Sequence, residues 1–160
     1  MSSDRDQYRP NVGVVLFGAD GRVWYGHRVG LDAASGWQFP QGGVDPGEDL
    51  EAAARRELAE ESGVRSVSLL ARTPGWLTYD YPAAFAGSKA ARSWKGQKQA
   101  WFAFRFEGGE AEIDLAADQH VEFDAWRWGP LAEAPELIVP FKRAVYLQVV
   151  AAFEGFAGGA

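Results

Sequence analysis

The segment from Gly42 to Val64, GGVDPGEDLEAAARRELAEESGV, constrains this chain more than any other part of its sequence. A loop containing Gly and Pro is followed by a run of good helix formers, and Gly63 stands where a helix would end. Residues three and four apart on a helix are neighbours, so Glu57, Glu60 and Glu61 would share one face. The segment therefore predicts a loop, an acidic helix and a glycine stop.

Three like charges on one helix face repel each other unless something offsets them. Carboxylate oxygens are natural ligands for Mg²⁺ or Mn²⁺, and Mg²⁺ commonly bridges carboxylates to substrate phosphates. The alternative is an ordinary solvated helix, in which Arg56 pairs with Glu60. The ordered loop, helix and glycine stop favour a metal site for phosphate chemistry.

With its flanks, this segment resembles the Nudix box at every specified position. The match begins at Gly42, passes through Glu48 and ends in the run from Arg56 to Val64. The resemblance implies a hydrolase that cleaves nucleoside diphosphates linked to another moiety and uses divalent metal ions. It also implies the Nudix fold, an α/β/α sandwich.

The remaining pattern predicts an α+β chain, a mixed sheet with helices on both sides, in one domain over residues 1–160. Residues 1–7 and 157–160 are polar or glycine-rich and are expected to be loose. We expect strands at Asn11–Phe17, Arg22–Arg28, Gly36–Phe39, Val64–Thr73, Gly75–Tyr81, Gln99–Glu107 and Phe123–Trp128, and helices from Glu48 or Asp49 to Ser62 and from Pro140 to Phe153.

Composition excludes several classes of protein. The chain has no cysteine, which rules out disulfides and thiolate sites. A net charge of −6 argues against sequence-independent binding to nucleic acid, and no DNA partner is expected. No signal peptide and no apolar run of about 20 residues is present, so we expect a cytoplasmic protein without a membrane partner.

Blocks outside the box resemble one subgroup of the family, the bacterial RNA pyrophosphohydrolases, which also includes dinucleoside polyphosphate hydrolases. The matching blocks are Tyr8–Gly13, Trp37–Gly43, Gly96–Gln99 with Trp101 and Phe102, Glu122–Phe123 with Trp126–Trp128, and Pro140–Arg143 with Val145 and Tyr146. The segment at 82–95 matches less well and borders the expected substrate site, where it would either alter the accepted substrate or form an ordinary loop.

Metal ions would lower the pKa of a bound water and bridge phosphate oxygens. Glu57 and Glu61 are the first candidate ligands, followed by Glu60, and two or more Mg²⁺ or Mn²⁺ ions are expected. A backbone carbonyl at Gly42 or its neighbours is a further candidate, because glycine lets backbone approach a ligand. The family pattern implies that one glutamate deprotonates the attacking water; Glu57 and Glu61 both stay open for this role.

The sequence also suggests places for one arginine and four further acidic residues. Arg56 is expected to orient the carboxylates through an ion pair, and Glu48 to reach back to the glycine loop. The subgroup resemblance implies a metal-binding or water-activating role for Glu122, which would otherwise be an exposed loop acid. Asp118 and Asp124 are interpreted as loop acids.

Substrate recognition needs cations for phosphates and aromatic rings for an unpaired base. His27 and His120 are too isolated to predict an imidazole metal site, and the tryptophans of the strand-like runs (Trp37, Trp101, Trp126 and Trp128) are expected in the core. The substrate-binding candidates are Arg9, Arg28, Gln97, Gln99, Tyr79, Phe141 and Lys142, with an exposed helix position as the alternative for Lys142 and the core for Phe141.

Two activities follow from the resemblance. The first is removal of pyrophosphate from the 5′-triphosphate end of RNA, and the second is hydrolysis of dinucleoside polyphosphates such as diadenosine tetraphosphate. A catalytically silent nucleotide-binding module is a third reading, which the complete set of box glutamates disfavours. An activating partner and the oligomeric state stay open.

Overall fold

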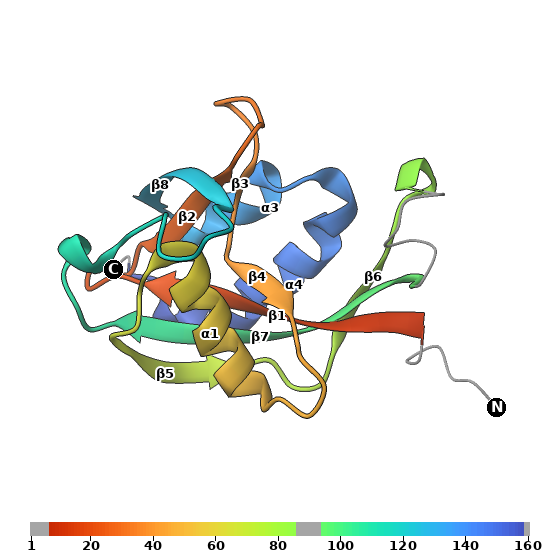
Figure 1. The fold of residues 1–160 in the computed structure, drawn as a ribbon, viewed down its shortest axis with the longest axis horizontal. Helices are drawn as coiled ribbons and strands as arrows, with labels where there is room; N and C mark the ends of the chain where they lie inside the picture. Colours follow the sequence, from red (N-terminus) through yellow and green to blue (C-terminus); the bar gives the residue numbers. More distant parts are fainter. Residues whose placement is uncertain (1–6, 86–93, 159–160) are drawn as a thin grey trace.

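The computed structural model of the chain describes residues 7–85 and 94–158 (Figure 1). Residues 1–6, 86–93 and 159–160 lie outside this description, and with them parts of the expected loose ends and of the 82–95 loop. The strands are β1 (Tyr8–Phe17), β2 (Val23–Arg28), β3 (Trp37–Gln38), β4 (Gln41–Gly43), β5 (Val67–Arg72), β6 (Leu77–Asp80), β7 (Gly96–Phe106) and β8 (Phe123–Gly129). The α-helices are α1 (Leu50–Ser62), α3 (Ala134–Leu137) and α4 (Arg143–Phe153).

All eight strands form one sheet with the order β3-β2-β1-β7-β5, in which β4 pairs with β1, β6 with β7, and β8 with β2. Strands β1 and β7 run parallel, with a continuous register from Tyr8 opposite Gly96 to Phe17 opposite Arg105. The other described pairs are antiparallel. The predicted mixed sheet is therefore confirmed.

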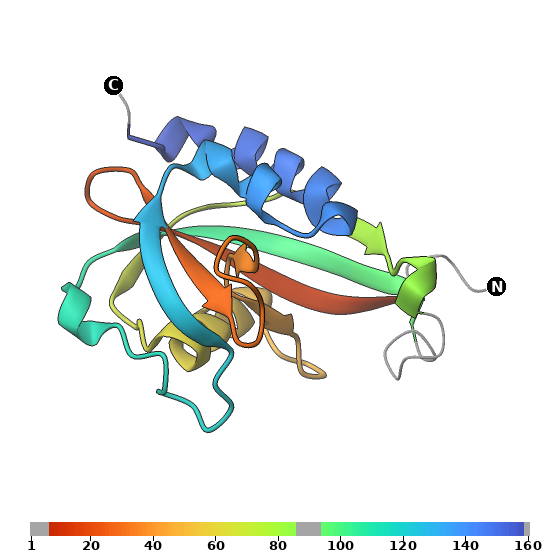
Figure 2. The ribbon, with the colours of Figure 1, turned by 90° about the horizontal axis from the view of Figure 1, so that it is seen from above.

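The sheet separates two helical layers, as Figure 2 shows with α1 on one side and α3 and α4 on the other. On the first side, Leu58 of α1 packs in a cluster with Val12 and Val14 of β1. On the second, Tyr146 of α4 packs in a cluster with Val15 of β1. Successive β1 side chains alternate between these two cores, as a strand requires. The expected α/β/α sandwich is confirmed.

Helix α1 begins and ends with the signals that its sequence carries. The side chain of Asp49 accepts a hydrogen bond from the Ala52 N–H at 3.0 Å and so caps the first turn. At the other end, Gly63 adopts a left-handed conformation with φ of 79°, and its N–H bonds to the carbonyl of Ala59. These two caps fix the length of the helix that carries the acidic residues.

The structure differs from the sequence expectations in several details. Gln41–Gly43, expected as a loop, pairs with β1 as strand β4. The last helix is preceded by a 3₁₀ turn at Pro140–Lys142, and short α3 was not expected. Among the tryptophans, Trp101 is fully buried, whereas Trp37, Trp126 and Trp128 are only half-buried at the edges of the two cores. No helix in the described ranges is long and apolar enough to cross a membrane.

Candidate active site

A cavity of about 450 Å³ lies where β1 and β4 meet the acidic face of α1. It brings together residues that are far apart in the sequence, from the N-terminal strand to the segment before β8. Its lining residues are Arg9, Gln41, Gly42, Gly43, Glu57, Glu60, Glu61, Asp118, His120 and Glu122. This acidic cavity contains every metal-binding candidate proposed from the sequence.

Glu57 and Glu61 are buried carboxylates, 9% and 7% exposed. They lie one helical turn apart on α1 and contact each other through their carboxyl groups. Burial raises the pKa of both, and for Glu61 the neighbouring Glu57 carboxylate raises it further. The Gln41 N–H donates to Glu61 Oε1 at 3.3 Å. Two adjacent buried acids with one backbone donor form a site that is short of positive charge.

Arg56 supplies part of that charge from the side of α1. Its guanidinium donates to Glu57 Oε1 at 2.9 Å and lies 3.3 Å from Glu60 Oε2. It also donates to Glu48 Oε2 at 2.8 Å and to the Gly43 carbonyl at 2.9 Å, which ties α1 to β4. The hydrogen bond from Arg56 holds the pKa of Glu48 at about 2.

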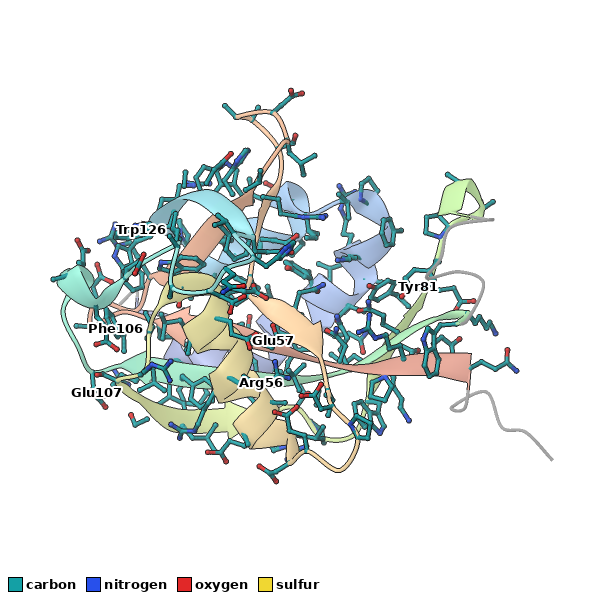
Figure 3. The ribbon with its side chains drawn as sticks, viewed as in Figure 1. Arg56, Glu57, Tyr81, Phe106, Glu107 and Trp126 are labelled. Atoms are coloured by element: carbon teal, nitrogen blue, oxygen red, sulfur yellow. The ribbon has the colours of Figure 1, made fainter. Side chains whose placement is uncertain are left out.

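Figure 3 shows Arg56 and Glu57 side by side along α1, next to β4. The partners of Arg56 named above are three carboxylates and the Gly43 carbonyl, and its role in orienting the carboxylates stays a prediction. The Glu48 carboxylate also accepts from the Asp45 N–H at 3.0 Å, which brings it back to the loop ahead of α1. Arg56 and Glu48 thus hold the loop, the helix and β4 in one arrangement.

Gly42 lies directly against the carboxyl group of Glu57. A Cβ atom at this position would overlap that carboxyl group, so any other residue would displace the acid or the strand. The Gly43 backbone is similarly close to Arg9, whose guanidinium would meet an added Cβ at 2.7 Å. The two glycines let β4 approach the acids of α1 from one side and a cation of β1 from the other.

Glu122 enters the acidic cavity from the segment that precedes β8. Its Oε2 lies 3.2 Å from His120 Nε2, and its charge raises the pKa of Glu61. Asp118 lines the same cavity. His120 and Asp118, which the sequence gave no reason to select, therefore lie beside the candidate ligands, because the 118–122 segment folds back over α1.

A divalent cation fits this donor set only in part. In the described ranges, no three His, Asp or Glu side chains are arranged as a ready-made metal cluster. The fit rests on Glu57 and Glu61, two buried carboxylates in contact, since a hard cation between them would offset the charge that burial penalises. The absence of a side chain at Gly42 makes room for the Glu57 carboxyl group, and Glu60 and Glu122 face the same cavity.

A second cavity, also of about 450 Å³, opens on the α4 side of the sheet. We call it the cationic pocket, because Arg9, Arg28 and Lys142 line it together with aromatic rings. Its full lining is Arg9, Arg28, Gln38, Gln41, Tyr79, Tyr81, Gln97, Glu122, Val139, Phe141 and Lys142. Arg9, Gln41 and Glu122 line both cavities, so the two are contiguous.

Lys142 is buried rather than exposed on the last helix, with 8% of its surface accessible. Its Nζ lies 5.7 Å from the centre of the Tyr79 ring and 5.9 Å from that of Phe141. Burial lowers the pKa of Lys142 to about 8, with a further contribution from the Arg28 charge. Phe141 is half-buried and Tyr79 is 7% exposed, with their ring centres 5.6 Å apart.

The two glutamines proposed for substrate differ in position. Gln97 lines the cationic pocket and donates to the Tyr81 hydroxyl at 3.3 Å. Gln99 is 1% exposed and lines neither cavity. Its side-chain N–H groups donate to Asn11, Gln41 and Gln97 at 3.0 to 3.2 Å. Gln99 therefore lies behind the lining of the cationic pocket and holds two lining residues, Gln41 and Gln97, by hydrogen bonds.

Gln38, Tyr81 and Val139 complete the cationic pocket and were not singled out from the sequence. Tyr81 lies at the far end of β6 in Figure 3, away from the acidic residues of α1. Aromatic and Gln residues near strand ends are too common to have selected Gln38 and Tyr81, and Val139 carries no chemical signal. Tyr81 reaches the pocket because β6 pairs with β7, and the sequence alone does not show this pairing.

The fold and the two joined cavities define a class of enzyme. The NUDIX domain model matches residues 7–149, and the chain belongs to the Nudix family. It is a hydrolase that acts on pyrophosphate bonds, and Nudix hydrolases generally use divalent metal ions.

Curated relatives match nearly the whole chain. A Caulobacter vibrioides protein named RNA pyrophosphohydrolase is 69% identical, over 98% of this chain and 91% of its own length. Proteins of the same name from Rhodospirillum rubrum and Rhizobium meliloti are 52% and 50% identical, covering 94% and 96% of this chain and 89% and 97% of their own lengths. The box and the blocks that flank it were thus sufficient to predict the family.

Solved structures agree on the fold. The E. coli dihydroneopterin triphosphate pyrophosphohydrolase aligns with a TM-score of 0.67 at 22% identity, over 91% of this chain and 98% of that one. A C. elegans Ap4A hydrolase complex aligns with a TM-score of 0.63 at 19% identity, over 92% and 98%. At this level of identity the likeness concerns the fold alone.

Proposed function

We propose that this protein removes pyrophosphate from the 5′-triphosphate end of RNA and leaves a 5′-monophosphate. One observation carries the proposal: an acidic cavity lies beside a pocket lined by three cations and three aromatic rings, and the two share three lining residues. Such a pair of cavities suits a substrate that joins several phosphates to a base. The names of the three close relatives support RNA as the substrate class.

In the cationic pocket, Arg9, Arg28 and Lys142 hold the phosphates. Arginine presents a fork of donors to phosphate oxygens, and buried Lys142 acts as a point charge. A terminal base stacks on the half-buried ring of Phe141, which in turn packs against the Tyr79 ring. Arg9 lies over the Gly43 backbone at the junction of the two cavities, and it directs the phosphates toward the acids of α1.

In the acidic cavity, Glu57, Glu61, Glu60 and Glu122, with a carbonyl of the Gly42 strand, would hold Mg²⁺ or Mn²⁺. Bound ions would supply charge neutralisation for the phosphates and would make a water more acidic. Glu57 or Glu61 takes the proton of the attacking water, and Arg56 holds the carboxylates in place. The water oxygen bonds to the α-phosphorus and the α–β anhydride bond breaks. Pyrophosphate then leaves with the bridging oxygen.

The test is turnover of 5′-triphosphorylated RNA beside diadenosine tetraphosphate with Mg²⁺ or Mn²⁺, with Glu57→Gln as the blank. Faster release of pyrophosphate from RNA supports the proposal. Preference for the dinucleotide makes the protein a nucleotide hydrolase instead, and activity on neither substrate supports the silent module. The cytoplasmic location and the binding of two or more ions, both expected from the sequence, belong to the same proposal.

A further inference from the structure

His27 lies in the interior of the β2–β3 end of the sheet, with 5% of its surface exposed. Its ring Nδ1 is 2.7 Å from Asp124 Oδ1 on β8, and its Nε2 is 2.5 Å from the backbone carbonyl of Asp32. The Trp37 ring packs against it edge to face, with centres 5.1 Å apart. His27 thus joins β2, β8 and the loop at 29–36.

Both partners of the His27 ring are acceptors: one is a carboxylate and the other is a carbonyl. A neutral imidazole donates from one nitrogen only, so it would leave a lone pair facing an acceptor. The doubly protonated ring donates to both. The Asp32 carbonyl and the Asp124 carboxylate accordingly raise the pKa of His27. With an acceptor facing each ring nitrogen, the geometry favours the doubly protonated ring.

The hydrogen bonds around His27 fix the position of the next residue, Arg28. The register of β2 against β8 shifts between His27 and Arg28, so a bulge turns the strand at this point. Beyond the bulge, the Arg28 N–H bonds to the Gly36 carbonyl at 2.9 Å, and the Val29 N–H bonds to the Glu122 carbonyl at 3.1 Å.

The loop at 29–36 folds tightly onto the His27 ring. Gly36 has φ of +87°, and an added Cβ there would lie 2.8 Å from Leu31 and 3.3 Å from His27 Nε2. The hydrogen bond to the Asp32 carbonyl closes this loop on the strand that carries Arg28. Without it, the loop would keep its backbone hydrogen bonds to Arg28 but lose its contact with a β2 side chain.

We propose that His27, held as an imidazolium between Asp124 and the Asp32 carbonyl, is a positioning residue that fixes Arg28 at the rim of the cationic pocket. This inference rests on the proposed function, because it assigns Arg28 to substrate phosphates. His27 itself does not line either cavity. It acts through the bulge and the loop.

The test is a double-mutant cycle between His27→Asn and Arg28→Ala. His27→Asn is expected to raise KM for 5′-triphosphorylated RNA about 5-fold with kcat within about 2-fold, and to add nothing in the Arg28→Ala background. Asp124→Asn, at an exposed position, should show the same KM effect and the same lack of additivity. Unchanged KM, or effects that multiply, would overturn the proposal.

Two measurements separate this inference from the proposed function. The same cycle is measured as Kd for inorganic tripolyphosphate, which requires no turnover. The chain has two histidines, so ring NMR signals are assigned with a His120→Gln variant. His27 should be doubly protonated at pH 7. Failure of wild-type turnover would refute RNA hydrolysis alone, whereas a neutral His27 ring would refute the positioning role alone.

Discussion

The acidic cavity and the cationic pocket share a wall but are built in opposite ways. In the acidic cavity, three carboxylates come from consecutive turns of one helix, where a single arginine contacts two of them, and Glu122 joins them from the segment before β8. The cationic pocket takes its side chains from the ends of several strands and from the turn before α4. The acidic helix of the first cavity is therefore determined by local sequence, whereas the second cavity depends on long-range pairing.

The largest effect is expected at the acidic cavity. Glu57→Gln should lower kcat by about 100-fold or more, since loss of a ligand should exceed the loss of a ligand's hydrogen-bond partner. KM should change little, because the cationic pocket is intact. Steady-state kinetics measure both. Glu51→Gln, on the same helix and paired with Arg55, is the matched control and should keep wild-type rates. Equal losses in the two variants would contradict the division of roles.

Arg56→Lys should have the next largest effect, a fall in kcat of about 10-fold. Lysine keeps the charge but cannot donate in one plane to Glu48, Glu57 and the Gly43 carbonyl together. If the acidic cavity acts in chemistry and the cationic pocket in binding, KM should stay near the wild-type value. A variant with wild-type kcat would show that charge alone, without the guanidinium geometry, organises the acids.

Lys142→Met should act on binding instead, raising KM about 10-fold through loss of one charged contact to phosphate. Lys98→Met is the control, since Lys98 lies over the Trp76 ring, which packs against the core on the α1 side. If Lys142→Met lowered kcat and left KM unchanged, the lysine would belong to the chemistry of the acidic cavity.

The same Lys142→Met variant should be more stable than wild type at neutral pH, because the buried charge is removed. The folded protein releases the Lys142 proton near pH 8, whereas an unfolded chain holds it to about 10.5. The free energy of unfolding contributed by this group therefore rises between pH 8 and 10.5, and the advantage of the methionine variant should shrink there. Urea unfolding of both proteins across this range measures the difference.

The smallest effect is expected at the N-terminal cap of α1, where a substitution should change stability but not activity. Asp49→Ala removes the cap on the Ala52 N–H and should lower the free energy of unfolding by about 1 kcal/mol. The rate at saturating substrate should not change, because Asp49 lies outside both cavities. Thermal unfolding and kcat, measured on one preparation, decide this point. A large loss of kcat would mean that the first turn of α1 reaches the acids.

The sequence predicted most of the fold and the shared helix face of Glu57, Glu60 and Glu61, because helix caps and periodicity are local signals. It did not predict that Gln41–Gly43 would pair with β1, since glycines weaken any strand pattern. It also left open whether Lys142 was exposed. That residue is buried because α4 packs on the sheet, which is a property of the assembled layers.

His27 shows a different limit of sequence analysis. Its isolation in the sequence gave no prediction for its surroundings beyond the interpretation that it is not an imidazole metal ligand. The partners that give it a charged ring lie on β8 and in the loop before β3, and the sequence spacing gives no sign of them. Glu122 was selected through resemblance alone, and its place next to Glu61 depends on the same folding of the 118–122 segment.

The parallel pairing of β1 with β7 has a consequence for how the enzyme matures. Arg9 pairs in register with Gln97, so this wall of the cationic pocket exists only after the chain has been made well past its midpoint. Contacts of such sequence separation close late and slowly in folding. A nascent chain that ends before β7 lacks the strand with which both β1 and β6 pair, so it cannot form the pocket beside α1. Substrate capture is therefore gained only near the end of folding, as the last strands join the sheet.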